Sequence, residues 1–323
     1  MKCCLILRFD KLRAAQQKNI IGKAMNLKSL FVLAAIGLVS ANCFSQNTIK
    51  SPAPTPSGSN VALFVLHKIA EVQGGYEVVY PYEGQERPSF AKQLADFEAG
   101  DLDVMWTLAN RKYEEDYQAI YYPLYYGMFG LRLPIVKNEN LHMFRGVKNL
   151  NDLKRFKVGQ GLGWADTDIL QANGLDVVEV TKYPNHFPML EGERFDYFPR
   201  AMHEPWSEVK TWSKYNLTVD PHIVIRYKVG FYFFVKKKDV ALIRYLNEGM
   251  AKLEENGMHK QIFLDDEEVQ MAFRNSNLEN RIVIDLANPE LTQNTPSDDS
   301  GLWLDINNLD AWLSGDSSQK QDL

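Results

Sequence analysis

A glycine-rich turn is the part of this sequence whose residue types and spacing best suit the binding of an anion. Gly159, Gly161 and Gly163 alternate with other residues, and Trp164 follows directly before a predicted helix. Backbone N–H groups of such a turn point together at the start of the helix, where they can donate to an anionic or carbonyl group of a ligand. The alternative is a tight connection between a strand and a helix.

Aromatic side chains are the second set of residues suited to a ligand. They are dense near the ends of predicted strands, where flat rings offer surfaces for stacking and tyrosine hydroxyls can orient a ligand. The set is Trp106, Tyr121, Tyr122, Tyr125, Tyr126, Trp164, Phe198 and Trp206. We expect most of them to fill the core, and predict that Trp106 and Trp164 face a ligand.

No arrangement typical of a catalytic or metal site occurs in the sequence. The six histidines are scattered, without the HxxxH or HxH spacing that gathers a metal. There is no GxSxG elbow, P-loop or dinucleotide fingerprint. His203 and Glu204 are adjacent, so their side chains point in different directions, and we interpret them as wall contacts rather than an acid–base pair. We therefore expect no metal, no cofactor and no enzymatic activity.

The first 45 residues have the pattern of a secretory signal peptide. Lys23 and Lys28 precede the apolar run 30–39, and small residues follow it. The run is too short to span a bilayer, and Met25 lies just before it, which leaves open an over-extended gene start over residues 1–24. The sequence therefore predicts export to the periplasm.

All three cysteines lie in or at the edge of this leader, at Cys3, Cys4 and Cys43. Cleavage near Ala41 or Ser45 leaves at most one of them, which removes disulfides, thiol catalysis and cysteine-ligated metals from the expectations. The alternative is that Cys43 is a lipid-modified first residue, but residues 40–42 make a poor lipobox.

Chain length and net charge limit the remaining classes of function. A chain of 323 residues with 45% hydrophobic composition is long enough to bury one large core or two moderate ones. Removal of residues 1–45 takes away seven of the 36 Lys and Arg and one of the 41 Asp and Glu, which leaves a net charge of −11. Nucleic acid is therefore an improbable partner, and no later segment is apolar enough to cross a membrane.

Alternating helical and strand patterns predict an α/β protein. Helical spacing begins at residue 61 and stops at the Gly74–Gly75 pair, followed by a strand over 76–80, a helix over 88–99 and a strand over 101–108. This order predicts a parallel sheet covered by helices. A second α/β unit is predicted over residues 157–225.

Two crossings between these units predict a hinged cleft, where small-molecule sites concentrate. An apolar, β-prone run over 125–136 leads out, and a strand pair over 223–235 returns. An amphipathic helix over 239–256 then ends at Gly257 and is predicted to pack on the first lobe. The predicted parts are a leader (1–45), a first lobe (46–130), a second lobe (131–228), a return to the first lobe (229–275) and a C-terminal wrap and tail (276–323).

Four segments resemble the periplasmic solute-binding proteins of the amino-acid-binding type. They are FEAGDLDVMWTLANRKYEEDYQAIYYPLYYGMFGLRL, VKNLNDLKRFKVGQGLGWADTDIL, LEGERFDYFPRAMHEPW and YFFVKKKDVALIRYLNEGMAKLEENG. The resemblance covers about residues 60–265 and lies in the order and spacing of the motifs. It implies the type 2 periplasmic-binding-protein fold, with two lobes that are each a mixed sheet flanked by helices, hinged by two crossing strands.

The resemblance also implies a site. The arginine after the first-lobe strand grips a ligand carboxylate in that family, and Arg111 matches it here, with Thr107 as a nearby hydroxyl. A guanidinium suits a carboxylate because its planar donors bind both oxygens. The alternative is a surface arginine paired with Glu114 or Glu115. The resemblance places Gly161, Gly163 and Trp164 on the second-lobe side of the same cleft.

Arg200 departs from the amino-acid binders, which commonly carry an acidic residue near this point to hold an ammonium group. Two cleft arginines would suit a ligand with more than one anionic group. The alternatives are an acidic contact restored by Asp166, Asp168 or Glu204, and a role for Arg200 in a structural salt bridge near the hinge.

The function that the resemblance implies is the capture of a small polar, carboxylate-bearing solute by an exported, monomeric protein that serves an ABC-type importer. The alternatives are a ligand-sensing accessory protein of a membrane signalling receptor, and an envelope scaffold without a ligand. An enzyme on the same scaffold is a further rival, because folds do not fix functions, but no nucleophile–base pair supports it.

Overall fold

The computed structural model describes residues 47–52, 59–84 and 88–314. The predicted signal peptide and all three cysteines lie outside these residues. The chain from Gln46 to Leu323 forms one compact unit by its own contacts. Among the described residues, no helix combines the length and the apolar character needed to cross a bilayer.

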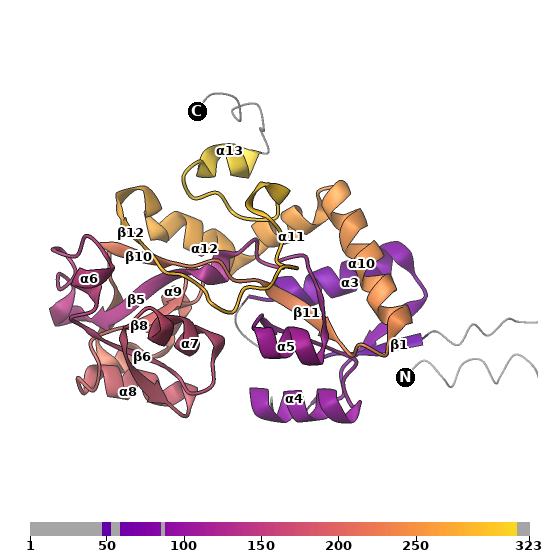
Figure 1. The fold of residues 1–323 in the computed structure, drawn as a ribbon, viewed down its shortest axis with the longest axis horizontal. Helices are drawn as coiled ribbons and strands as arrows, with labels where there is room; N and C mark the ends of the chain where they lie inside the picture. The colour runs from indigo at the N-terminus through magenta and orange to yellow at the C-terminus, as the bar shows by residue number, and fades with distance from the viewer. Residues whose placement is uncertain (1–46, 53–58, 85–87, 315–323) are drawn as a thin grey trace, which may run out of the picture. The chain divides into compact units, whose positions relative to one another are not determined.

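The first lobe is built on a three-stranded sheet of order β3-β11-β4 (Figure 1). β11 lies between the other two strands and is antiparallel to both. The predicted parallel sheet does not join β2 to β3, because β3 pairs antiparallel with the returning strand β11. A parallel pair does form between β1 and β2. The bounds are β1 (Asn47–Lys50), β2 (Tyr76–Val79), β3 (Val104–Leu108), β4 (Gln118–Ile120) and β11 (Phe231–Val235).

Four helices cover the first lobe, and three of them match predicted helices. They are α3 (Val61–Gln73), α4 (Phe90–Ala99), α5 (Arg111–Asp116) and α10 (Val240–Glu255). The predicted C-terminal ends of α3 and α10 are confirmed, since Gly74 and Gly257 both have positive φ, at 65° and 73°. α10 packs along α3, as predicted (Figure 1). The short helix α5 was not predicted.

Gly249 allows α10 to approach α3 closely. A Cβ atom at this position would lie 2.4 Å from Cγ2 of Ile69 and 2.7 Å from Nε2 of Gln73. We expect Gly249→Val to lower the free energy of unfolding by about 1–3 kcal/mol, because the two helices must move apart. Urea denaturation measures this. Ala251→Val, on the exposed face of α10, is the control, and equal losses in the two variants would contradict the close contact.

The second lobe is built on mixed sheets, as predicted. One sheet has the order β12-β10-β5-β8, with β9 also paired to β5, and β6 forms a parallel pair with β7. The bounds are β5 (Leu131–Lys137), β6 (Lys157–Gly161), β7 (Asp176–Val180), β8 (Phe198–Ala201), β9 (Leu217–Val219), β10 (Ile223–Arg226) and β12 (Ile282–Asp285).

The remaining helices are short. The α-helices are α6 (Leu150–Leu153), α7 (Ala165–Ala172), α8 (His186–Glu191), α9 (Pro205–Thr211), α11 (Met258–Asp265), α12 (Glu267–Ser276) and α13 (Leu309–Ser314). Turns of 3-10 helix lie at Met128–Gly130, Asn138–Asn140, Tyr183–Asn185, Ser213–Tyr215, Leu278–Asn280 and Asp298–Ser300. α7, α8 and α9 lie close to the helices that the sequence predicts near 166–172, 186–191 and 204–214, and β6 and β7 lie close to the strands predicted over 157–159 and 177–180.

The two crossings between the lobes touch each other directly. β5 pairs antiparallel with β10, and a Cβ on Gly130, just before β5, would lie 1.9 Å from the carbonyl oxygen of Tyr227. The predicted strand over 125–136 is interrupted, because Tyr126 and Gly127 have positive φ and start a turn. The outward crossing is therefore a turn followed by a strand.

The core runs through these crossings. Leu131 and Leu133 of β5 pack with the core of the first lobe, whereas Val136 of the same strand packs with the core of the second lobe. Leu108, at the end of β3, also packs against the second-lobe core. The junction of the lobes is therefore a packed region rather than a flexible linker.

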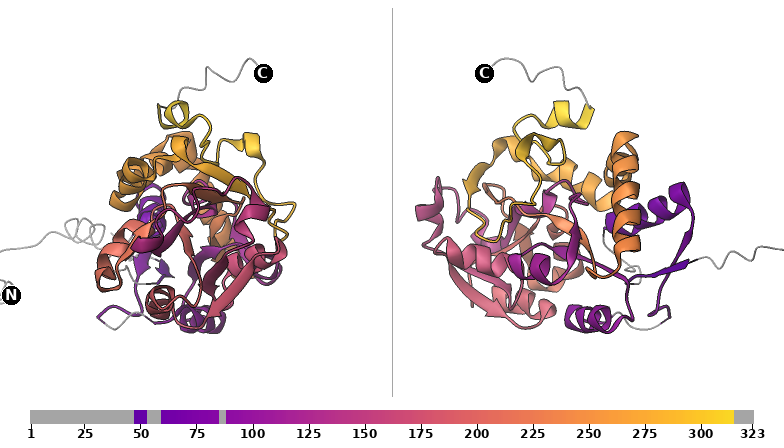
Figure 2. Two further views of the ribbon diagram at one scale, coloured as in Figure 1. Left: turned by 90° about the vertical axis from the view of Figure 1, so that its left-hand side faces the viewer. Right: turned by 45° about the vertical axis from the view of Figure 1, so that its right-hand side comes forward.

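The predicted C-terminal wrap follows β12, a strand that was not predicted. β12 pairs in parallel with β10, and the chain then runs past α7 and α5 before it turns to α13 (Figure 1). Figure 2 shows this gold segment on the outside of the ribbon in two further views. It therefore contacts elements of both lobes.

Candidate functional site

A buried cluster of five charged side chains lies where β5 and β8 pair at the junction of the lobes. Its two cations are Arg132 of β5 and Arg200 of β8, whose exposed fractions are 1% and 7%. Its three anions are Asp166 in the first turn of α7, Glu204 directly before α9, and Glu208 within α9. Charges this deeply buried need partners inside the protein.

Arg132 ties both crossings to α7. Its Nη2 atom pairs with Oδ1 of Asp166, and its Nη1 atom lies 3.8 Å from Oε2 of Glu204. The hydroxyl of Tyr227, which follows β10, donates to the same Asp166 oxygen at 2.6 Å. Burial raises the pKa of Tyr227 well above its ordinary value, so the phenol stays a donor.

Arg200 is neutralised within the second lobe. Its Nε atom donates to both carboxylate oxygens of Glu208, at 2.9 and 2.8 Å, and its Nη2 atom lies 2.7 Å from Oε1 of Glu204. Its guanidinium carbon lies 5.5 Å from the ring centroid of Trp164 and 5.6 Å from that of Tyr183. This geometry matches the structural salt bridge rather than an arginine held ready for a ligand carboxylate.

The cluster holds one carboxylate in excess of its guanidinium groups. Burial alone would raise the pKa of Glu204, but the charges of Arg200 and Arg132 lower it below the ordinary value. Burial raises the pKa of Glu208, and the neighbouring charge of Glu204 adds to this. Of the five side chains, that of Glu204 is the most exposed, at 21%.

His203 is a wall residue of this junction. Its ring stacks on Tyr125 at 5.2 Å between centroids and meets Phe129 edge to face. Burial lowers its pKa to about 4, so the ring is neutral near pH 7. Its Nδ1 atom has no hydrogen-bond partner among the described residues. No acid–base pairing with Glu204 is present in this arrangement.

The glycine-rich turn joins β6 to α7, where it was predicted. A Cβ on Gly161 would lie 2.3 Å from the ring of Trp164, so the indole lies directly over this glycine. Gly163 has φ of 74° with open space beside it, and Trp164 is the N-cap of α7. The indole also stacks on His186. Trp164 therefore packs between the turn and Arg200.

Trp106 and Thr107 lie on opposite faces of β3, because side chains alternate along a strand. Trp106 packs edge to face on Phe233, on the face from which Leu108 reaches the second-lobe core. Thr107 shares the other face with Met105, whose cluster lies within the first lobe. Trp106 thus packs on the apolar cluster that includes Leu131 and Leu133 of β5, and Thr107 lies on the opposite face of β3.

Arg111 is exposed at the start of α5 and contacts the C-terminal wrap. Its Nη2 atom donates to the carbonyl of Pro289 at 2.9 Å, and its backbone N–H donates to Oε2 of Glu290 at 3.2 Å. Glu114, one of its expected partners, instead accepts from the hydroxyl of Tyr121 at 2.9 Å. The structure does not bring Arg111 together with Arg200 or with the glycine-rich turn in any recorded contact.

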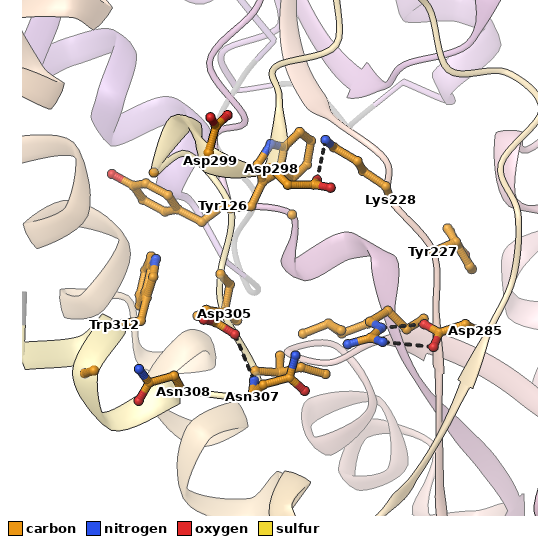
Figure 3. Close-up of a pocket in the computed structure, with 18 of the residues that line it drawn as sticks. Tyr126, Tyr227, Lys228, Asp285, Asp298, Asp299, Asp305, Asn307, Asn308 and Trp312 are labelled. Atoms are coloured by element: carbon orange, nitrogen blue, oxygen red, sulfur yellow. Dashed lines mark hydrogen bonds and ion pairs between the residues drawn. The ribbon is translucent and has the colours of Figure 1, made fainter. Parts of the chain in front are cut away.

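A pocket of about 1010 Å³ lies on the crossings, beneath the C-terminal wrap (Figure 3). Arg226 and Asp285 form a bidentate pair in its wall, at 2.5 and 2.9 Å. Labelled lining residues are Tyr126, Tyr227, Lys228, Asp285, Asp298, Asp299, Asp305, Asn307, Asn308 and Trp312. None of the seven predicted site residues lines it, so it is separate from the predicted cleft.

The described part of the chain offers no group of three or more His, Cys, Asp or Glu side chains placed to hold a metal ion.

Two solved structures match most of the chain with a TM-score of 0.50. A histidine kinase sensor domain with similarity to periplasmic binding proteins is 16% identical, and the match covers 69% of this chain and 97% of that one. The chain has the fold of the periplasmic binding proteins. An amino acid ABC transporter substrate-binding protein from Streptococcus pneumoniae, bound to L-arginine, is 15% identical over 70% of this chain and 95% of its own.

At these identities the likeness shows the periplasmic-binding-protein fold and not the ligand. No protein-family model matches the chain, and no curated protein matches its sequence. The predicted two-lobed fold is confirmed, and both matched proteins are binding or sensing domains by name.

Several residues of the charge cluster escaped the sequence analysis. Asp166 and Glu204 were named as alternative acidic contacts, but Arg132, Glu208 and Tyr227 were not considered. A signal for Arg132 was present, since it is the single charged residue in the apolar run Leu131–Val136. A lone charge in a strand that is buried on both faces requires an internal partner.

Proposed function

We propose that this chain is an exported, non-enzymatic protein that binds a small polar solute between its two lobes. The observation that carries the proposal is the charge cluster of Arg132, Asp166, Arg200, Glu204 and Glu208, which second-lobe elements hold beside the crossings of a periplasmic-binding-protein fold. Polar groups gathered beside the junction of two lobes are typical of solute sites. A solute that contacts both lobes stabilises the closed arrangement.

The charge balance of the cluster suggests which end of a solute it receives. Glu204 is its most exposed carboxylate and has a lowered pKa, so it is suited to accept from an ammonium or another donor. In the glycine-rich turn, the N–H groups of Gly161, Leu162 and Trp164 already donate within the protein, to Oε1 of Gln160 and to the carbonyls of Val180 and Gly161. We therefore propose a solute that carries a hydrogen-bond donor group, rather than one with several anionic groups.

Delivery to an ABC-type importer is the output that we propose. The matched substrate-binding protein serves such a transporter by name, whereas the other matched domain belongs to a histidine kinase. A sensing role beside a membrane receptor is the second candidate. Both outputs require the same solute-dependent closure, so the binding test comes first.

A thermal-shift screen of the compact unit Gln46–Leu323 tests the binding function. The panel comprises amino acids, polyamines, di- and tricarboxylates and short peptides. A solute at about 100 times its Kd stabilises the native state by about 2.7 kcal/mol. For a chain of this size, that raises Tm by roughly 5–10 °C. No shift across the panel would contradict the proposal and favour the scaffold alternative.

Two variants decide whether a shift arises at the proposed site. Glu204→Gln is expected to weaken binding of the active solute about tenfold or more, because a charge-assisted hydrogen bond is lost. Thr107→Val is the matched control, because Thr107 lies on the face of β3 opposite Trp106. Equal affinities in Glu204→Gln and the parent would place the solute elsewhere.

A further inference from the structure

The C-terminal wrap makes specific contacts with both lobes and with both crossings. We call residues 287–306 the strap. Most of its residues are exposed or half-buried, so polar contacts rather than a core of its own hold it in place. Its attachment points fall at four separate places in the fold.

The second-lobe anchor of the strap is Asn173, the C-cap of α7. Its Nδ2 atom donates to the carbonyl of Ala287 at 2.7 Å, and its Oδ1 atom accepts from the N–H of Ala287 at 3.0 Å. This reciprocal amide pair fixes the backbone of the strap to the second lobe through a single side chain.

The first-lobe anchors lie on α5 and directly after β4. Besides the contacts of Arg111 with residues 289 and 290, the hydroxyl of Thr292 pairs with Oε2 of Glu114. The side-chain amide of Asn294 donates to the hydroxyl of Tyr121 at 3.1 Å. The strap therefore passes from the second lobe to the first within eight residues.

The third and fourth attachments hold the strap on the crossings. Lys228 of the return crossing donates to the carbonyl of Pro296 at 2.7 Å and lies 4.6 Å from the ring centroid of Trp303. A Cβ on Gly127 of the outward crossing would lie 2.6 Å from the ring of Trp303, so this indole packs on the glycine. The N–H of Leu304 donates to the carbonyl of Tyr126 at 2.7 Å.

We propose that the strap restrains the lobes at the separation seen here, and that solute entry and release require the Asn173 anchor to open. The reason is geometric, because one continuous segment is bonded to both lobes and any widening between α7 and α5 must break bonds at one end. We take Asn173 as the end that yields, since one side chain makes the hydrogen bonds between the strap and α7, whereas several side chains hold the first-lobe and crossing ends.

The inference about solute exchange rests on the proposed function, but the restraint itself is measurable without any solute. The compact unit Gln46–Leu323 contains no cysteine. Spin labels on Ala95→Cys in α4 and Glu191→Cys in α8, both exposed, report the separation of the two lobes by pulsed electron paramagnetic resonance.

We expect a narrow distance distribution in the parent and a wider one, shifted to longer distances, in Asn173→Ala combined with Arg111→Ala. Three hydrogen bonds to the strap are lost in this variant, so the ratio of open to restrained molecules should rise about tenfold. A chain that ends at Leu286 should show the same change.

Gln171→Ala is the matched control. Gln171 lies in the last turn of α7 and bonds Glu179 at 3.0 Å within the second lobe, so its loss should leave the distances unchanged. The proposal is overturned if the parent distribution persists in both the double variant and the shortened chain, or if Gln171→Ala widens it equally. If the shortened chain fails to fold, the double variant alone decides.

The claim that the strap controls solute entry and release is tested with a solute that raises Tm in the screen. Stopped-flow binding should show association and dissociation both about tenfold faster in the double variant than in the Gln171→Ala control. If the spin-label distances widen but the association and dissociation rates stay the same, the strap restrains the lobes without controlling solute exchange. That result would overturn the kinetic part of the proposal. If no solute binds, the proposed function fails, and the distance measurement still decides whether the strap restrains the lobes.

Discussion

Replacement of Arg132 by alanine is expected to lower the free energy of unfolding by about 3–5 kcal/mol, the usual effect of removing one partner of a buried ion pair. Arg132 is 1% exposed, and Asp166 is 3% exposed. Without the guanidinium, the Asp166 carboxylate keeps a single side-chain donor, Tyr227, in a site that water reaches poorly. The unpaired charge, rather than the lost attraction, makes the substitution costly.

Urea denaturation of the parent and Arg132→Ala measures this loss. Arg226→Ala is the matched control, because Arg226 lies on the adjacent strand β10 and also pairs with one aspartate, Asp285, but with side chains 33% and 63% exposed. We expect it to lose at most about 1 kcal/mol. Equal losses in the two variants would show that burial does not govern the Arg132 pair.

A double substitution separates the contribution of the buried charges to stability from that of side-chain packing. Arg132→Met together with Asp166→Leu removes both charges and keeps apolar volume, so most of the stability lost in Arg132→Ala should return. Failure to recover would show that the hydrogen bond from Tyr227, or the fit of the guanidinium over its ring at 5.7 Å, matters more than the charge.

The sequence predicted well those elements whose signals are local. α3, α10, β6 and β7 are bounded by glycines or by clear changes of hydrophobic period, and they form where expected. β12 was missed because its burial comes from pairing with β10, about sixty residues earlier in the chain. The antiparallel order of the first sheet was missed for the same reason, since β11 enters it from far along the chain.

The residues of the candidate site also divide into those with a local signal in the sequence and those without one. The glycine-rich turn before α7 could be located because glycine spacing is a local signal. The partner of each arginine could not be found from spacing, because Arg132 meets Asp166 from another element and Arg111 meets residues 289 and 290 from the far end of the chain. Arg200 is the exception, since both of its carboxylates follow within eight residues. A structural salt bridge was among the alternatives for this residue.

Two buried histidines should make the protein sensitive to mild acid. Burial lowers the pKa of His186 and of His203 to about 4, from an ordinary value of 6.5. The unfolded chain therefore binds more protons than the native state between pH 6.5 and 4, so stability falls as the pH falls through this window. A pKa shift of this size lowers the free energy of unfolding by about 3 kcal/mol for each histidine once the pH is below 4.

The effect of His203 can be isolated because aromatic rings enclose it. The charges that face it are those of Glu204 and Asp266, which raise its pKa, and of Arg200 and Arg132, which lower it. His203→Phe keeps a ring between Tyr125 and Phe129 but cannot take up a proton. We expect this variant to lose about 2.4 kcal/mol less than the parent between pH 7 and 4.5, measured by urea denaturation at each pH.

His142→Gln, the replacement of an exposed histidine, is the control variant. The comparison between variants is needed because buried carboxyl groups contribute with the opposite sign. Burial raises the pKa of Asp220 and of Glu268, so their protonation stabilises the native state as the pH falls. If His203→Phe and the parent lose the same stability, then His203 is protonated without cost, and the junction of the lobes must admit water to its ring.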